Sequence, residues 1–365
     1  MRRFSYERIC LFVSVVLLIY IGWSIISPSK RSHQDEPDSL QQLAYIRALN
    51  TSSPILQNTQ LCSFDKIDLL IVIISSGQRF LERQSIRETW RSMTDSFGVH
   101  SKHLFVMGYF PFDNLFKDLT NEAAHEQDIL FLTVDEELIT LKELHAYRWL
   151  ERYCPNVPFI FKTEDDLFIN TLLLHELIRE LKTNPNDRNN RYLYNTRIDS
   201  FFVDETARNA TQYLYGLAYM PGKPERNGTT SPFYVTYQEY PHELYPRYCS
   251  GFGYLMNAAT KRALTTEGFK DKNPFRFSDI FMTGIIPDRL NFVCEIMPFI
   301  IHQGTMEQCM GFVKNNSVEN PPPSTTPLLV CSTGRHLGNN AFSDYYRMWT
   351  ALKLLYANRL KPKTQ

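Results

Sequence analysis

Three consecutive acids, Glu164, Asp165 and Asp166, directly follow the apolar run "PFIFKT". A short apolar run of this kind is typical of a buried β-strand, so the acids stand at its carboxyl end. In open α/β sheets, ligands bind beyond the carboxyl ends of the strands. Carboxylates gathered there can hold a hard divalent cation, Mg²⁺ or Mn²⁺, that shares its remaining sites with substrate phosphates. The alternative is a solvated acidic loop that caps the next helix.

A row of arginines in "RFLERQSIRETWR" is the second group that could do chemistry. Arg79, Arg83, Arg87 and Arg91 recur every four residues, which places them along one side of a helix. This helix follows the first strand of the domain, so its start faces the same crevice as the acids. Arginines there can bind the phosphates of a nucleotide, and we expect this of Arg79, Arg83 and Arg87. The alternative is a solvated face paired with the helix's own glutamates.

Two later stretches contain residues that could bind a sugar and act as a general base. "YPRYCSGFGYLMN" contains Tyr245 and Tyr248, which can stack on sugar rings, and Gly251 and Gly253, which permit close backbone approach. The alternative is an aromatic core with a tight turn. In "FRFSDIFMTG", Asp279 lies between apolar residues, where burial raises the pKa of a carboxyl and makes it a better general base. The alternative for this residue is a structural hydrogen bond.

The elements that must position these residues alternate between strands and helices. "KIDLLIVIIS", "HLFVMGY", "DILFLTV" and "PFIFKT" predict strands, while "GQRFLERQSIRETWRS", "EELITLKELHAYRWLERYC" and "TLLLHELIRELKT" predict helices. Asn170 can cap the last of these helices. The alternation predicts an α/β domain with a mostly parallel sheet flanked by helices. After about Tyr192 the pattern gives way to shorter strands and loops.

The N-terminal segment reads as a membrane anchor. Residues 9–26 contain no charged side chain, and basic residues stand on both sides. We predict a cytoplasmic tail at 1–8, an uncleaved signal anchor at 9–26, a lumenal stem at 27–65 and a single catalytic domain at 66–365. A cleaved signal peptide, the alternative, would have a shorter apolar core and a small-residue cleavage site.

Glycosylation acceptors and cysteines agree with a lumenal placement. Asn-x-Ser/Thr tripeptides occur at Asn50, Asn209, Asn227 and Asn315. Of seven cysteines, Cys10 lies in the apolar segment, and the remaining even number fits up to three disulfides in an oxidising compartment, with the pairing left open. The formal net charge of zero gives no field that would attract nucleic acid. The oligomeric state is not indicated.

Four stretches in this order, "RQSIRETW", "KTEDDLFIN", "YPRYCSGFGY" and "SDIFMTG", resemble the motifs of the β1,3-glycosyltransferase family that includes β1,3-galactosyltransferases and β1,3-N-acetylglucosaminyltransferases. The resemblance covers about Ile67 to Gly284. It implies a GT-A fold, a UDP-sugar donor, Mn²⁺ (or Mg²⁺) as cofactor, and inverting transfer to the 3-hydroxyl of an acceptor glycan. It also implies a single-pass type II protein of the Golgi membrane, with a nucleotide-sugar half at 66–190 and an acceptor half at 191–365.

The resemblance assigns roles to individual positions. Glu164, Asp165 and Asp166 match the family's metal motif, with Asp166 as the direct ligand, and Asp279 matches the presumed base. The "SIRETW" helix matches the donor-nucleotide region. Glu164 departs conservatively from the usual first Asp of the metal motif.

Two departures leave questions open. Ser278 stands where the family has Glu beside the base, which removes one charge. A histidine near the C-terminus completes the metal shell in family members, and His336 is the candidate here, with His302 as its competitor.

The sequence and the resemblance together predict a β1,3-hexosyltransferase that acts on glycoproteins or glycolipids, with galactose as the expected sugar. The alternatives are transfer of N-acetylglucosamine or N-acetylgalactosamine, a catalytically silent sugar-binding protein on the same fold, and a membrane-anchored adaptor whose acids bind Ca²⁺.

Overall fold

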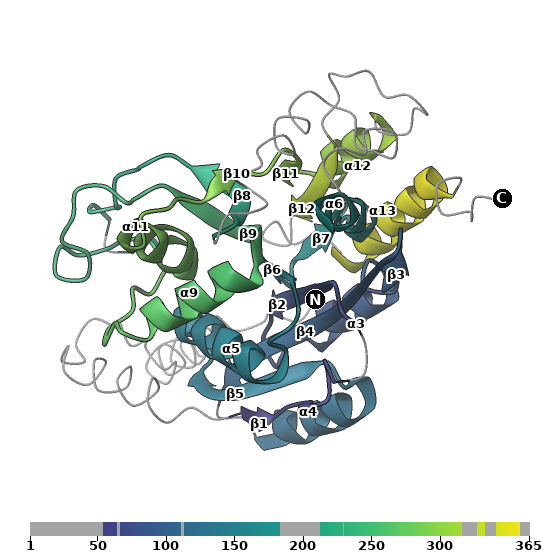
Figure 1. Cartoon of the computed structure of the whole chain (residues 1–365), viewed down its shortest axis with the longest axis horizontal. Coiled ribbons are helices and arrows are strands. Elements are labelled where there is room, and N and C mark those ends of the chain that lie inside the picture. Colours follow the sequence, from purple (N-terminus) through teal and green to yellow (C-terminus); the bar gives the residue numbers. More distant parts are fainter. Residues whose placement is uncertain are drawn as a thin grey trace, which may run out of the picture. The chain divides into compact units, whose positions relative to one another are not determined.

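Figure 1 shows the computed structural model of the chain. It describes residues 54–63, 66–110, 113–182, 212–228, 230–315, 327–332 and 341–357. These residues all belong to one compact unit, Ile46–Gln365. The predicted tail and anchor lie outside the described residues, as do Asn50, Asn209 and His336. Within the described ranges, no helix combines the length and apolar character needed to cross a membrane.

Four parallel strands form the middle of the main sheet, in the order β5-β4-β2-β6. They are β2 (Leu69–Ile74), β4 (Val99–Tyr109), β5 (Ile129–Asp135) and β6 (Phe159–Glu164). All four were predicted from their apolar runs, because a strand covered on both faces needs apolar side chains in both directions. Every residue of β2 is buried.

The rest of this sheet is largely antiparallel. β9 (Tyr248–Asn257) pairs antiparallel with β6, and β8 (Leu214–Tyr219) pairs antiparallel with β9. β10 (Glu295–Ile296) then adds in parallel to β8. At the other edge, β1 (Pro54–Leu56) pairs antiparallel with β5. The short strand β3 (Asp95–Ser96) lies outside this order and pairs antiparallel with the start of β4. The sheet is therefore mixed, and the predicted mostly parallel arrangement holds only for its centre.

A small second sheet begins directly after the acidic triplet. Its strands are β7 (Leu167–Ile169), β12 (Leu328–Ser332) and β11 (Ile300–Gln303). β12 pairs antiparallel with β7 and parallel with β11. Glu164 thus ends β6, and Asp165 and Asp166 form the turn at which the chain passes from one sheet to the other.

Helices cover both faces of the main sheet. The longer ones are α3 (Phe80–Glu88), α4 (Asp113–Glu126), α5 (Ile139–Tyr153), α6 (Thr171–Lys182), α9 (Ala258–Gly268), α12 (Met306–Asn315) and α13 (Ala341–Tyr356). In Figure 1, α5 and α9 lie together on one side of the sheet, with α3, α6 and α13 on the other. The core on the α3 side joins Leu69, Ile71 and Ile73 of β2 to Ile86 and Trp90.

The second half of the domain contains three short helical segments in succession. They are α10 (Ser278–Ile280), the π-helical segment η2 (Phe281–Ile285) and α11 (Ile286–Arg289). The predicted cap of α6 is confirmed, because the Asn170 side chain accepts a hydrogen bond from the Leu173 N–H at 3.1 Å.

Three disulfides join the six cysteines outside the apolar segment, as their number predicted. The pairs are Cys62–Cys154, Cys249–Cys294 and Cys309–Cys331. The first of them ties the residues before β2 to the end of α5. Together with β1, it places residues 54–63 in the folded unit, ahead of the predicted boundary at residue 66.

Candidate active site

The parallel pairing of β2 and β6 brings the acidic triplet to the start of α3. Ile74, the last residue of β2, stands in register with Glu164, and the Asp165 N–H donates to the Ile74 carbonyl at 3.2 Å. The chain then runs from β2 to Arg79, which forms an ion pair with Asp165. The acidic triplet and the first arginine of the row are therefore in contact, as expected.

The three acids differ in exposure and so in what they can do. Asp165 is fully buried, and burial raises its pKa to about 6 against the opposing attraction of Arg79. Its carbonyl accepts the Tyr345 hydroxyl at 3.1 Å. Asp166 is half-buried, and the Glu164 side chain is 36% exposed. Asp165 thus faces inward and holds Arg79, while Glu164 and Asp166 are the acids open to a ligand.

Glu164 and Asp279 come together around Gly251. The Lys162 ammonium donates to Glu164 Oε1 at 3.2 Å and to the Gly251 carbonyl at 3.2 Å. The Gly251 backbone also acts on the Asp279 carboxylate and opposes the rise in its pKa. A Cβ at Gly251 would lie 2.8 Å from Glu164 Oε1, so a larger residue at this position would displace the Glu164 carboxylate. Residues more than 100 positions apart therefore build one acidic site.

Asp279 has the environment of a general base. Burial raises its pKa, while the Ile280 N–H, at 2.8 Å from Oδ1, and the charge of Lys162 oppose the shift. Burial also acts on Lys162 and would lower its pKa, but attraction to Glu164, to Glu143 and to Asp279 outweighs it and the pKa is raised. Lys162 is therefore a permanent cation beneath the acids.

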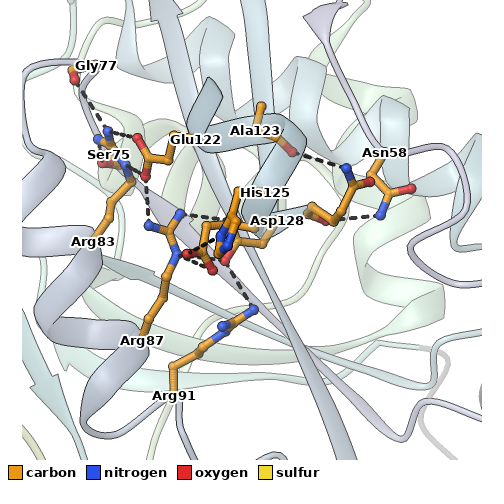
Figure 2. Close-up of polar contacts among 12 residues, drawn as sticks. Asn58, Ser75, Gly77, Arg83, Arg87, Arg91, Glu122, Ala123, His125 and Asp128 are labelled. Carbon is orange, nitrogen blue, oxygen red and sulfur yellow. Dashed lines mark hydrogen bonds and ion pairs between the residues drawn. The ribbon is translucent and has the colours of Figure 1, made fainter. Parts of the chain in front are cut away.

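The structure separates the arginine row into two groups, and Figure 2 shows the contacts of Arg83 and Arg87. Arg79 is 35% exposed beside the acids. Arg83 is fully buried and its guanidinium grips Glu122, at 2.8 and 2.6 Å, while Arg87 is buried against Asp128 at 2.8 Å. We therefore correct the expectation for Arg83 and Arg87: carboxylates from α4 and the start of β5 turn this helix face into a buried ion-pair network, and Arg79 remains the donor candidate.

The two predicted acceptor tyrosines have different surroundings. Tyr245 is buried in an aromatic cluster, with its ring 5.0 Å from that of Tyr240. Tyr248 is half-buried, its ring lies 5.4 Å from Tyr219, and burial together with the nearby Asp279 raises its pKa to about 12. Tyr248 is thus the tyrosine of this pair that borders the acidic site.

Gly253 has a packing role. A Cβ there would meet the Phe161 ring at 2.7 Å, so the missing side chain lets β9 lie close against β6. As predicted, this glycine permits close backbone approach, and the group that the backbone approaches is the Phe161 side chain in the core.

Sequence reasoning missed Lys162 and Glu143. Glu143 lies on the buried face of α5, where it accepts hydrogen bonds from the hydroxyls of Ser278, Tyr147 and Tyr254. A glutamate between Leu141 and Leu144 on an apolar helix face could have indicated a buried carboxylate with partners, because glutamate is almost never fully buried unless it is paired.

Metal ligands were expected among the three acids. No group of three His, Cys, Asp or Glu side chains gathers as a metal site among the residues described. Two accessible carboxylates, Glu164 and Asp166, nevertheless suit a cation that takes its other ligands from water and phosphates. His302 contacts Gln308 at 3.3 Å and the Phe312 ring at 5.0 Å.

Two glycosylation acceptors fall among the described residues. Asn227 is exposed, as an acceptor must be, and Asn315 is the last residue of α12.

The sequence is similar to those of known glycosyltransferases. The family model described as "Galactosyltransferase" matches residues 81–297, more than half of the chain. Beta-1,3-galactosyltransferase 5 of Gorilla gorilla gorilla is 28% identical over 291 residues, which covers 79% of this chain and 83% of the relative. Beta-1,3-galactosyltransferase 4 of Rattus norvegicus is 27% identical, with 66% and 68% covered. UDP-GalNAc:beta-1,3-N-acetylgalactosaminyltransferase 1 of Homo sapiens is 26% identical, with 60% of each chain covered.

A solved structure, the galactosyltransferase LgtC in complex with donor and acceptor sugar analogs, matches 77% of this chain and 95% of its own. The identity is 10% and the TM-score is 0.34, too low to support an argument.

Proposed function

Because the chain belongs to the galactosyltransferase family, we propose that it is an inverting β1,3-hexosyltransferase that moves galactose from a UDP-sugar to the 3-hydroxyl of an acceptor glycan on a glycoprotein or glycolipid. One observation carries the proposal: a partly exposed acid at a strand end, Glu164, and a half-buried acid whose pKa is raised, Asp279, meet around Gly251. The names of the two beta-1,3-galactosyltransferase relatives support the linkage and the sugar.

Asp279 serves as the base in this proposal. An inverting transfer is a single displacement in which the acceptor oxygen bonds to the anomeric carbon while the bond from that carbon to the diphosphate breaks. Asp279 takes the proton of the acceptor hydroxyl, so no nucleophilic side chain is required. The Ile280 N–H fixes the carboxylate, and burial keeps it basic. Tyr248 borders the acceptor side.

The donor side is built from acids and one arginine. Glu164 and Asp166 would hold Mn²⁺ or Mg²⁺, which when bound supplies positive charge to the leaving diphosphate. Asp165 aims the Arg79 guanidinium at the same crevice through their ion pair. Arg79 can therefore contribute charge-assisted hydrogen bonds to a phosphate.

The cellular setting is part of the proposal. We propose a Golgi protein anchored by residues 9–26 with a stem up to the folded unit, followed by a nucleotide-sugar half at 66–190 and an acceptor half at 191–365. The three disulfides support an oxidising lumen. The four Asn-x-Ser/Thr sites remain candidate glycosylation positions.

A second candidate is transfer of N-acetylgalactosamine. The similarity to the human N-acetylgalactosaminyltransferase favours it as the first alternative donor. The acidic site serves either sugar, because the base and the diphosphate contacts are the same for both.

The test is a donor screen on the full-length protein. UDP binding is measured with and without Mn²⁺, and UDP release is then followed with UDP-galactose, UDP-N-acetylgalactosamine and UDP-N-acetylglucosamine against a panel of acceptor glycosides. We expect Mn²⁺-dependent binding and release from UDP-galactose. Failure to bind UDP under either condition would remove the role given to the acids.

A matched pair of variants tests the base. Asp279→Asn should keep UDP binding and lower turnover by about 100-fold or more. Asp288→Asn, the same substitution at an exposed acid of α11, should leave turnover unchanged. An Asp279→Asn protein as active as the parent would show that the base lies elsewhere.

A further inference from the structure

A fully buried carboxylate, Glu143, lies directly behind the acidic site. Three hydroxyls donate to it: Tyr147 from the next turn of α5 at 2.8 Å, Tyr254 from β9, and Ser278 from the start of α10. A buried carboxylate is tolerated only when it is hydrogen-bonded and charge-balanced. The donors meet the first condition, and they tie three separate elements to one side chain.

Lys162 meets the second condition and links Glu143 to the site. Its ammonium lies 4.0 Å from Glu143 Oε2 and 3.2 Å from Glu164 Oε1, and it is 1% exposed. The cation thus stands between an inner acid and an outer one. Among the described residues, Glu164, Glu143 and Asp279 are the carboxylates that attract Lys162. Without Glu143, the position of Lys162 would follow the two that belong to the acidic site.

Helix α5 also holds the chain that leads into Asp279. The Thr140 hydroxyl donates to the carbonyls of Phe275 at 2.8 Å and of Arg276 at 3.0 Å. One helical turn further along α5, Glu143 accepts the Ser278 hydroxyl. The residues just before Asp279 are therefore docked on α5 at three points, of which the last adjoins Asp279.

We propose that Glu143 is a positioning residue of the transfer reaction: it accepts the Ser278 hydroxyl and restrains Lys162, and so holds Asp279 and Glu164 in their mutual geometry. This inference rests on the proposed function. Its role is to place groups that touch the substrates, while Glu143 itself is shielded from them. Positioning of this kind has large effects on turnover, because small displacements of reacting groups slow chemistry strongly.

A side-chain exchange tests the proposal. Glu143→Ser removes the inner carboxylate, and Ser278→Glu forces two carboxylates into one buried place. Each single variant should lower kcat at least about tenfold, and the donor KM and Mn²⁺-dependent UDP binding should change by a smaller factor. The double variant, Glu143→Ser with Ser278→Glu, restores one carboxylate and one hydroxyl across the same gap. It should recover kcat to within about threefold of the parent, a coupling that independent sites do not show.

A second buried glutamate supplies the control. Glu176 in α6 is also fully buried, and it accepts the Tyr356 hydroxyl at 3.3 Å, outside the acidic site. Glu176→Ser should lower the urea midpoint of unfolding while the folded protein keeps its kcat. The comparison separates positioning from a general loss of stability.

The outcomes are distinct. The inference is overturned if Glu143→Ser keeps the parental kcat, if its loss merely follows the folded fraction as in Glu176→Ser, or if the double variant is no more active than the weaker single one. A parental full-length protein that releases no UDP from any donor would overturn the proposed function, and the inference with it. An active parent with an unrescued exchange would overturn the inference alone.

Discussion

Replacing Arg83 with lysine should destabilise the protein and leave donor binding intact. Arg83 is fully buried, and its guanidinium donates to both oxygens of Glu122 and to the Ser76 carbonyl at 2.6 Å (Figure 2). Lysine keeps the positive charge, but its side chain is shorter and carries one compact ammonium group in place of the planar guanidinium. The paired contact with Glu122 and the contact with the carbonyl cannot both survive.

The expected loss follows from those contacts. Hydrogen bonds to charged groups contribute about 1.5 to 3 kcal/mol each, and Arg83→Lys loses two of them. Part of the cost is recovered, because Arg87 still contacts Glu122 at 2.8 Å and keeps that carboxylate paired. We expect a decrease of about 3 kcal/mol in the free energy of unfolding, close to the cost of breaking a buried ion pair outright.

Urea unfolding of the full chain with its disulfides intact measures this change, and UDP titration measures donor binding in parallel. Arg262→Lys is the matched control, since Arg262 pairs with Glu151 at 3.0 Å but is 63% exposed. It should change the free energy of unfolding by less than about 0.5 kcal/mol. The reasoning is refuted if Arg83→Lys unfolds at the parental urea concentration yet binds UDP more weakly, as a donor-contacting arginine would.

Three further changes test the packing, a buried histidine and a disulfide. Gly253→Ala should cost about 1 to 3 kcal/mol of stability, because its Cβ would stand 2.7 Å from the Phe161 ring; an unchanged melting temperature would contradict this. Burial lowers the pKa of His175 to about 4, so the folded state binds this proton more weakly than the unfolded state. The stability that His175 contributes is then complete above about pH 6.5 and is lost as the pH falls to 4. Relative to His175→Gln, the parent should lose up to about 3 kcal/mol across that window in urea unfolding, and parallel curves would exclude the effect. Replacing Cys249 and Cys294 together by alanine should cost about 4 kcal/mol, from the entropy of the 45-residue loop that they close; a shift below about 1 kcal/mol in urea would show that the loop is already ordered in the unfolded chain.

The parallel strands at the centre of the sheet could be predicted, because a strand that is buried on both faces appears in the sequence as a continuous apolar run. β2 and β6 are short apolar runs, and the acids that end β6 mark the strand's carboxyl edge. The direction of β9 was not readable, since an apolar strand looks the same whether it runs parallel or antiparallel to its neighbour. The predicted mostly parallel sheet therefore held only up to the strand that returns from the second half.

The arginine row shows a second limit of sequence reasoning. A period of four residues establishes that Arg79, Arg83 and Arg87 share a side of α3, but it does not say what faces that side. The decisive carboxylates, Glu122 and Asp128, stand about 40 positions further along the chain, and only the packing of α4 and β5 brings them in. The same spacing thus covers Arg79, for which we propose a phosphate contact, and a buried ion-pair network one turn later.

The role of Ser278 also depends on contacts that the sequence motif does not reveal. Judged by position, a serine where the family has glutamate removes a charge beside Asp279 and favours a catalytically silent protein. In space, the Ser278 hydroxyl donates to the buried carboxylate of Glu143, which also faces Lys162. The charge balance of a site depends on which carboxylates stand within a few ångströms, and α5 supplies one that the motif lacks. The departure at Ser278 therefore gives no ground for a silent protein, because the missing acid has a counterpart 135 positions away in sequence and one hydrogen bond away in the fold.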